Sequence, residues 1–152
     1  MTMTIGCDGY DLSILNPTQF KLIFNKIPTV EFFCQAVNLP SLVMTPVKQD
    51  TPFLDLHHPG EKFYHQPLRA RILLDKKMET YFEIYKWMKN LSTLNRAVEG
   101  FSDCQLIIGD RTFNFYDVFP IELDQVEFDI AATDIQTVTF NVTFEFDYFD
   151  LK

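Results

Sequence analysis

Apolar and polar residues alternate almost without exception from Gln136 to Tyr148. The apolar side of this pattern is mostly aromatic and consists of Val138, Phe140, Val142, Phe144, Phe146 and Tyr148. The polar side consists of Thr137, Thr139, Asn141, Thr143, Glu145 and Asp147. Because successive side chains of a strand point to opposite faces, the pattern predicts one long strand with a buried aromatic face and a wetted polar face. Strands of about a dozen residues are roughly twice the usual length and are more typical of walls, channels and barrels than of a catalytic cleft.

Shorter alternations predict strands elsewhere in the chain. They lie at Phe20–Lys26, Val30–Val37, Phe63–Leu74, Cys104–Ile108, Thr112–Phe119 and Ile121–Asp129. The first two are predicted to pair as a hairpin, as are the fourth and fifth, with Pro120 at the end of that hairpin or at a bulge. Prolines at positions 46 and 52 restrict residues 43–56 to an edge strand or a long loop, and residues 57–60 are predicted to turn.

The hydrophobic period changes to that of a helix after Asp75, which is a plausible N-cap. Apolar residues then recur at helical spacing, at Met78, Tyr81, Phe82, Tyr85, Met88 and Leu91. This pattern predicts one amphipathic helix packed on the outside of the sheet. Trp87 is expected to serve in packing or in a subunit contact rather than in ligand binding.

Together these elements predict a mainly β fold. The expected architecture is a β-barrel or β-sandwich of about seven to eight mostly antiparallel strands with one flanking α-helix. The 152 residues are enough for one domain spanning residues 1–152. Residues 1–18 have no sustained period and are predicted to form an N-terminal arm.

The net charge of −8 is distributed unevenly. Residues 1–111 contain twelve basic and twelve acidic side chains, whereas residues 112–151 contain nine acids and no base. Such an acidic region repels phosphate backbones, so the sequence argues against a protein that grips nucleic acid. A face that serves only solubility is the simpler interpretation of the acids.

No pattern typical of an enzyme is present. A Gly-x-Ser-x-Gly motif and a glycine-rich phosphate loop are both missing from the sequence. Cys34 falls in the middle of an apolar run, where a buried small side chain is a better interpretation than a nucleophile. Glu122 and Asp124 share one strand face, but chance pairs are expected among nine acids.

A metal site and a secreted or membrane protein are also disfavoured. The best metal candidates are His57, His58, Asp55 and His65, but adjacent histidines of a strand point in opposite directions, and a surface loop explains them better. Three widely spaced cysteines, Cys7, Cys34 and Cys104, form no disulfide framework. No apolar run approaches the length that a bilayer requires, and the first residues lack the features of a secretion signal.

Several segments, taken in order, carry a resemblance to a known family. They are Phe33–Gln35 with Leu39–Pro40, Gly60–Phe63, Pro67–Leu68 with Ile72–Asp75, Tyr85–Trp87, and Asp134–Thr137 leading to Phe146–Tyr148. This ordered set, which spans roughly Phe20 to Tyr148, resembles the tail-tube proteins of contractile-tailed bacteriophages and the tube-like proteins that start the tube at the baseplate. The N-terminal lead-in differs from that of a major tube subunit and favours a baseplate-proximal ring.

The resemblance implies a structural protein that is not an enzyme and needs no cofactor. Six subunits would form a ring whose sheets join into one inner barrel, and rings would stack into a conduit through which DNA passes transiently during ejection. The implied partners are further copies of the chain, a tape-measure protein, and sheath or baseplate proteins. The implied location is the virion tail, after assembly in the host cytoplasm and without membrane insertion.

The resemblance also suggests roles for three sets of residues. Those expected to face the lumen are Thr139, Asn141, Thr143, Glu145, Glu122 and Asp124. Those expected at ring-to-ring contacts lie in residues 45–60, with the N-terminal arm beside them, and include Thr45, Asp50, Phe53, His57 and His58. Those expected to contact the sheath lie at or near the helix exterior and are Lys76, Lys77, Lys86 and Lys89.

Two other functions fit the same pattern. One is a tube protein of a bacterial secretion or contractile injection system, in which the lumen carries protein. The other is a small-ligand-binding β-barrel whose aromatic face lines a cavity, which predicts a monomer.

Overall fold

The computed structural model describes residues 13–93, 100–131 and 137–152. The helices are α1 (Val30–Phe33) and α2 (Glu79–Thr93). The strands are β1 (Phe20–Phe24), β2 (Cys34–Asn38), β3 (Leu42–Met44), β4 (Val47–Gln49), β5 (Leu56–His58), β6 (Phe63–His65), β7 (Leu68–Leu73), β8 (Ser102–Ile108), β9 (Arg111–Leu123), β10 (Thr139–Glu145) and β11 (Tyr148–Leu151). Most of the predicted N-terminal arm, Cys7, and the start of the predicted last strand lie outside the described residues.

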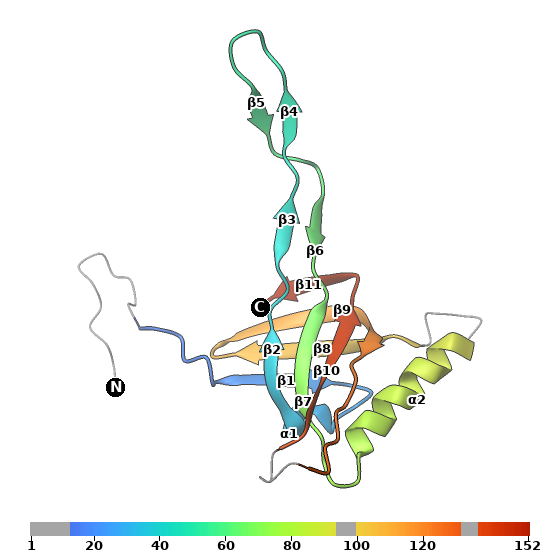
Figure 1. Cartoon of the computed structure of the whole chain (residues 1–152). Helices are drawn as coiled ribbons and strands as arrows, with labels where there is room; N and C mark the ends of the chain where they lie inside the picture. The colour runs from blue at the N-terminus through green and yellow to red at the C-terminus, as the bar shows by residue number, and fades with distance from the viewer. Residues whose placement is uncertain (1–12, 94–99, 132–136) are drawn as a thin grey trace.

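Seven strands form one antiparallel sheet in the order β1-β8-β9-β10-β7-β2, with β11 paired to β9. The sheet folds over at β9 into two layers (Figure 1). The β8 layer contains β1, β8, β11 and residues 111–118 of β9. The β7 layer contains β2, β7, β10 and residues 119–123 of β9. The predicted mainly antiparallel β-sandwich with a flanking helix is confirmed.

Strand β9 belongs to both layers because it bends at a bulge. Between the pairs Ser102↔Val118 and Cys104↔Phe115, β9 contains one residue more than β8, and Asp117 there has a positive φ of 54°. Such bulges bend a strand and let it pass from one packed sheet to another. Of the two positions predicted for Pro120, the bulge is the one observed: Pro120 lies within β9 beside a second register shift, where a missing N–H is tolerated, and not at the end of the hairpin.

The prediction of a single long C-terminal strand is also wrong. Strand β10 ends at Glu145, and after residues 146–147 the chain enters β11, which pairs with β9 in the other layer. The N–H of Asp147 donates to the carbonyl oxygen of Tyr116 at 3.1 Å, so the chain follows β9 around its bend. The side chain of Tyr148 is consequently 54% exposed rather than buried.

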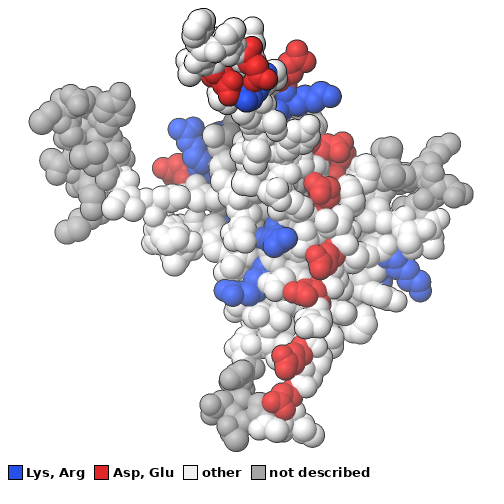
Figure 2. Space-filling view, turned by 45° about the horizontal axis from the view of Figure 1, so that its top comes forward, with Lys and Arg blue, Asp and Glu red and all other residues white. Residues whose placement is uncertain are grey.

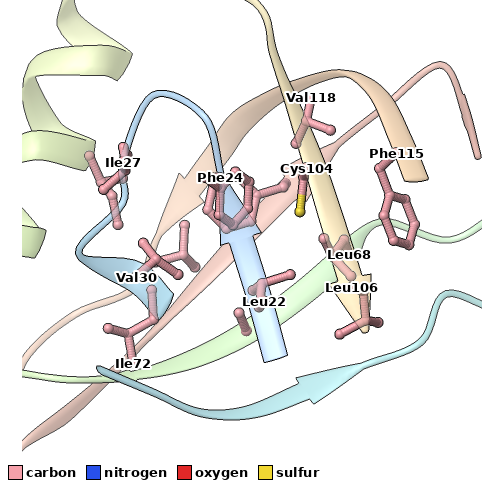
Figure 3. Packing of buried hydrophobic residues seen from close by; sticks show 14 of the residues in the cluster. Leu22, Phe24, Ile27, Val30, Leu68, Ile72, Cys104, Leu106, Phe115 and Val118 are labelled. Carbon is pink, nitrogen blue, oxygen red and sulfur yellow. The ribbon is translucent and has the colours of Figure 1, made fainter. Parts of the chain in front are cut away.

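The apolar faces of the two layers form the core (Figure 3). The predicted aromatic row of β10 is fully part of it, because Phe140, Val142, Phe144 and Phe146 are at most 2% exposed. Leu22 and Phe24 of β1 face this row from the β8 layer, and the rings of Phe24 and Phe144 lie 4.6 Å apart between centroids. Because the row is packed against other side chains, it argues against a ligand-binding barrel with a cavity along this face.

Helix α2 covers one end of the core, but it is rotated relative to the sequence prediction. Its buried residues are Thr80, Ile84 and Trp87, whereas Phe82 and Tyr85 are about half exposed. The indole N–H of Trp87 donates to the carbonyl oxygen of Gly100 at 2.6 Å, and its ring packs against Phe24 and Phe144. The largest side chain of the helix thus occupies the core, Tyr81 packs against Phe140 beside it, and Phe82 and Tyr85 point outward.

The predicted hairpin between residues 20–26 and 30–37 is wrong. Strand β1 pairs with β8, and β2 pairs with β7. Between them the chain forms the single turn of α1, in which Val30 is buried. The two strands therefore enter different layers instead of pairing.

Residues 42–65, which we call the projecting hairpin, extend away from the two layers (Figure 1). Strand β3 pairs with β6 near its base, and β4 pairs with β5 farther out. A Cβ atom at Gly60 would lie 2.1 Å from the carbonyl oxygen of Thr45, so the arms approach closely between the two pairs. The turn predicted at residues 57–60 is misplaced, because His57 and His58 belong to β5 and the chain reverses within residues 50–55. Neither described helix has the length and apolar character needed to cross a bilayer.

Candidate functional site

The outer face of the β7 layer is polar and hollowed. Arg71 is paired with Asn141 across β7 and β10, and Thr143 is paired with Arg69 on one side and Glu122 on the other. The hollow has a volume of about 590 Å³ and is lined by Ala36, Asn38, Arg69, Ala70, Arg71, Glu122, Asp124, Asn141 and Thr143. Four of the six residues expected to face a lumen therefore line one surface.

Hydrogen bonds fix the centre of this surface. The N–H of Asp124 donates to the carbonyl oxygen of Asn141 at 2.9 Å, and the side-chain amide of Asn141 donates to the Asp124 carboxylate at 3.2 Å. Thr143 is only 8% exposed, because it lies on the middle strand between the longer side chains of Arg69 and Glu122. The surface is thus a rigid sheet floor with charged side chains on either side.

The other two predicted lumen residues lie at the ends of β10. Thr139 and Glu145 are both half-buried. The Glu145 carboxylate lies 3.7 Å from Nδ1 of His65, at the base of the projecting hairpin, and the ring of His65 stacks on Phe146. Glu145 therefore touches the junction between β10 and the hairpin as well as the polar face.

The polar face is not exclusively acidic, contrary to the expectation from the charge distribution. The exposed side chains of Arg69 and Arg71 form a basic row on β7. This row lies two strands away from Glu122, which belongs to β9, and from Asp124, which directly follows β9. Acidic and basic groups lie side by side on the surface shown in Figure 2. Alternation along residues 68–74 predicted that both arginines point outward, but only the pairing of β7 with β10 brings them to this face.

The β7 layer has an open edge on each side. In the part of the chain that the structure describes, β2 pairs only with β7, and residues 119–123 of β9 pair only with β10. Open edges expose unpaired N–H and C=O groups and are templates for pairing with another chain.

The projecting hairpin contains all five residues expected at ring-to-ring contacts, namely Thr45, Asp50, Phe53, His57 and His58. Each is exposed, and Phe53 at the far end is 99% exposed. The ammonium group of Lys48 forms ion pairs with Asp55 and Asp50, and its hydrogen bonds to these two carboxylates raise the pKa of Lys48. The tip is therefore held by local charge pairs while its apolar side chains remain uncovered.

The four lysines expected to contact a sheath are exposed at one side of the molecule. Lys76 and Lys77 precede α2, and Lys86 and Lys89 lie on its outer face. The sequence analysis missed that Phe82 and Tyr85 share this outer face at helical spacing. Their exposure follows from the burial of Trp87, which the hydrophobic period alone did not indicate.

Cys34, Cys104 and the three histidines are not arranged as a reactive or metal-binding site in the described part of the chain. Burial raises the pKa of Cys34 to about 11 and raises that of Cys104 well above its ordinary range, so neither thiol is readily ionised. Nε2 of His58 lies 3.1 Å from the side-chain oxygen of Gln49. Among residues 13–93, 100–131 and 137–152, no three His, Cys, Asp or Glu side chains come together in a way that would hold a metal ion.

Comparison with solved structures relates this architecture to known assemblies. The tube-terminating cap of the anti-feeding prophage superposes with a TM-score of 0.70 at 13% identity, covering 99% of both chains. The sheath/tube terminator of an extracellular contractile injection system, PVC, gives 0.68 at 16% identity over 93% of this chain and 99% of that chain. The PVC sheath-tube complex gives 0.64 at 17% identity over 93% of each chain.

The chain has the tail-tube fold. Further structures with this fold include a component of the anti-feeding prophage baseplate, at a TM-score of 0.65 and 11% identity over 88% of this chain and 90% of that chain. No protein-family model and no curated protein sequence matches the chain. Comparison of structures thus detects the tail-tube fold at 11–17% identity, where the comparisons with family models and curated sequences detect no match.

Proposed function

We propose that this chain is a structural subunit of a contractile tail tube, or of a specialised ring at one end of that tube. One observation carries the proposal: the β7 layer has a packed apolar face, a polar hollowed face and two open edges. When copies of such a sheet join side by side, the N–H and C=O groups at their open edges become paired. The polar faces then form the wall of a channel together.

The strand directions of the β7 layer suit such a ring. Its four strands alternate in direction, because β2, β7, β10 and β9 are paired antiparallel in that order. In a cyclic ring, β2 of one copy therefore runs antiparallel to β9 of the next. The same antiparallel pairing can continue across every junction.

A ring of six copies follows the symmetry of the anti-feeding prophage baseplate, which is described as sixfold. Six four-stranded layers at about 4.8 Å per strand give a wall roughly 115 Å around and hence roughly 37 Å across. The β8 layer and α2 then lie outside the wall. Lys76, Lys77, Lys86 and Lys89 become available to a sheath or baseplate protein, beside Phe82 and Tyr85.

The polar face would line the lumen, with Asn141 and Thr143 in its floor and Glu122 and Asp124 beside them. Two arginines oppose three carboxylates when Glu145 is included, so the lumen keeps a small negative charge per subunit. Such a wall does not retain a phosphate backbone, and DNA can slide past after a tape-measure protein has left. The role is passive conduction within a virion tail that assembles in the host cytoplasm.

The projecting hairpin would connect successive rings. Its apolar side chains are exposed along the whole length, including Leu42 at 53%, Val47 at 57%, Phe53 at 99% and Phe63 at 62%. Apolar surface of this extent marks a contact with another chain. With the domain boundaries predicted from the sequence, residues 1–18 would form an arm beside this contact.

Electron microscopy of the purified full chain tests the proposal. Negative-stain images are expected to contain rings with sixfold symmetry, and short stacks of rings at higher concentration. A chain that remains monomeric at all concentrations, by light scattering and by imaging, would contradict the assignment.

A tube protein of an extracellular contractile injection system is the second candidate. It is favoured by the structural similarity to the PVC proteins, which belong to such a system. Both candidates predict rings, and they differ in cargo. Intact particles containing this subunit would carry packaged DNA in the first case and no DNA in the second, so an assay of purified particles for DNA separates them.

A further inference from the structure

The two arginines of β7 have no partner among the described residues of their own subunit. Arg69 and Arg71 are both exposed on the polar face. Neither guanidinium group forms an ion pair or a hydrogen bond with another described residue. The Cα atoms of these two residues are about 6.6 Å apart along the strand, and two guanidinium groups without a partner among the described residues form a short basic row that is suited to carboxylates.

The carboxylates of the same subunit lie two strands away, and the intervening strand separates them from the arginines. Strand β10 lies between β7 and β9, which are therefore about 9.6 Å apart. On β10, Asn141 already donates to Asp124, and Thr143 lies between Arg69 and Glu122. No ion pair between the basic row and Glu122 or Asp124 forms across this strand.

On its other side, β7 is bordered by β2 and then by an open edge. Arg71 is paired there with Ala36, whose side chain is a single methyl group, and Arg69 is paired with Asn38. A second copy can join this edge through residues 119–123 of its β9. Glu122 and Asp124 of that copy then also lie two strands away from the arginines. Beside Arg71 the path now crosses the single methyl group of Ala36 instead of the longer Asn141 side chain, which leaves room for this arginine to extend.

We infer that Arg69 and Arg71 form ion pairs with Glu122 and Asp124 of the neighbouring copy of this chain. This inference rests on the proposed ring and identifies the side chains that select its junction. Complementary charges at a rim determine which edges meet and in which register, and they make association dependent on salt. The other occupant of the basic row would be an acidic cargo in the lumen, and the test below distinguishes the two.

Charge reversal with exchange tests the pairing. The double variant R69E/R71E, and separately E122R/D124R, is expected to raise the concentration needed for ring formation by at least about tenfold. Combining all four substitutions restores opposite charges across the junction and is expected to restore rings. The matched control is K86E/K89E, which reverses two exposed lysines on α2 and is expected to form rings as the wild type does.

The outcomes separate this inference from the proposed function. Wild-type rings together with unchanged R69E/R71E rings would overturn the inference and leave the ring proposal intact. Failure of the fourfold variant to recover rings would also overturn it and would favour a cargo-binding role for the arginines. A wild-type chain that never forms rings would overturn both.

A milder variant covers the case in which a reversed charge disturbs folding. R69Q/R71Q keeps long polar side chains and is expected to retain the thermal unfolding midpoint of the wild type. Added salt is expected to raise the protein concentration that the wild type needs for ring formation. The concentration that R69Q/R71Q needs should change little with salt. An equal salt dependence in both proteins would count against the ion pairs.

Discussion

The two-layered body and the projecting hairpin both contain large apolar side chains, but the body buries them and the hairpin exposes them. In the body, Phe140 and Phe144 are at most 1% exposed and pack against β1 and α2. In the hairpin, Phe53 and Phe63 are 99% and 62% exposed, although both arms are regular paired strands. Two-stranded ribbons have only two faces and no second layer, so they cannot bury a side chain by themselves.

Under the proposed function, this contrast means that the stability of the subunit and its assembly depend on different residues. Substitutions in the body should lower the free energy of unfolding of the isolated subunit. Substitutions in the hairpin should leave that free energy unchanged and alter contacts between copies. The following experiments test this division, beginning with the largest expected effect.

Replacing Phe144 by alanine should have the largest effect on folding. This side chain is fully buried between Phe24 and Trp87, and truncation leaves a cavity that costs about 3–5 kcal/mol. Chemical denaturation monitored by circular dichroism measures the loss. The same truncation at exposed Phe63 should cost less than about 0.5 kcal/mol. A similar loss at both positions would contradict the division between body and hairpin.

Replacing Trp87 by phenylalanine should lower the free energy of unfolding by about 1–3 kcal/mol. The change removes the donor to the buried carbonyl oxygen of Gly100, which is then left unsatisfied. Thermal and chemical denaturation measure the effect. Tyr85→Phe, on the exposed face of the same helix, provides the comparison and should be neutral. A neutral Trp87→Phe would mean that this hydrogen bond does not hold α2 to the body.

Thiol reactivity should distinguish the two regions without disturbing either. The pKa of Cys34 is raised from 9.0 to about 11 by burial, so in the Cys7→Ser variant we expect labelling at pH 8 to be about a hundredfold slower than for an ordinary thiol. Adding Phe53→Cys places a thiol at the exposed tip, which should react at the ordinary rate. Fast labelling of Cys34 in the folded protein would show that the body opens more readily than its packing indicates.

The same pKa shift predicts a loss of stability in alkaline solution. The thiol of Cys34 ionises near pH 9 in the unfolded chain and near pH 11 in the folded one. The unfolded state therefore binds fewer protons between these values, and the free energy of unfolding falls as the pH rises from 9 to 11. Denaturation of Cys34→Ala across this range should lack that component of the decline.

Replacing Phe53 by serine should have the smallest effect on the isolated subunit, within about 0.5 kcal/mol of the wild type. Under the proposed function, however, it removes an apolar anchor between rings, so single rings should persist while stacks become shorter. Stack lengths in negative-stain images provide the measurement. Phe128→Ser, at a body residue that is 69% exposed, is the matched control. Stacks of normal length in Phe53→Ser would remove the hairpin tip from the ring-to-ring contact.

Much of the body could be predicted from alternation because a half-buried strand has a two-residue period. The burial of Phe140, Val142, Phe144 and Phe146 follows from it directly. The ends of strands could not be predicted in this way, since the period of β10 continues in phase through residues 146–147, where the chain changes layers. The continuation of β9 through Pro120 depends on a bulge at Asp117, which only its partner strands reveal.

The candidate site was predicted in part for a related reason. The outward direction of Glu122, Asn141 and Thr143 is local information, whereas the arrival of Arg69 and Arg71 beside them depends on the order of strands in the sheet. Residues 43–56 were predicted as an edge strand or a long loop, because Pro46 and Pro52 limit pairing with a central sheet; they do not exclude an isolated ribbon, which is what forms. The rotation of α2 depended on which of its four aromatic residues pack against the core.

The passage of β9 through both layers has a mechanical consequence. Its last residues form an edge of the β7 layer, and its first residues lie within the β8 layer, joined by an unbroken backbone at Asp117. In the proposed ring, a load applied to the exterior would therefore reach the channel lining along covalent bonds rather than only through contacts between side chains. The β7 layer and the β8 layer would move together instead of sliding past each other.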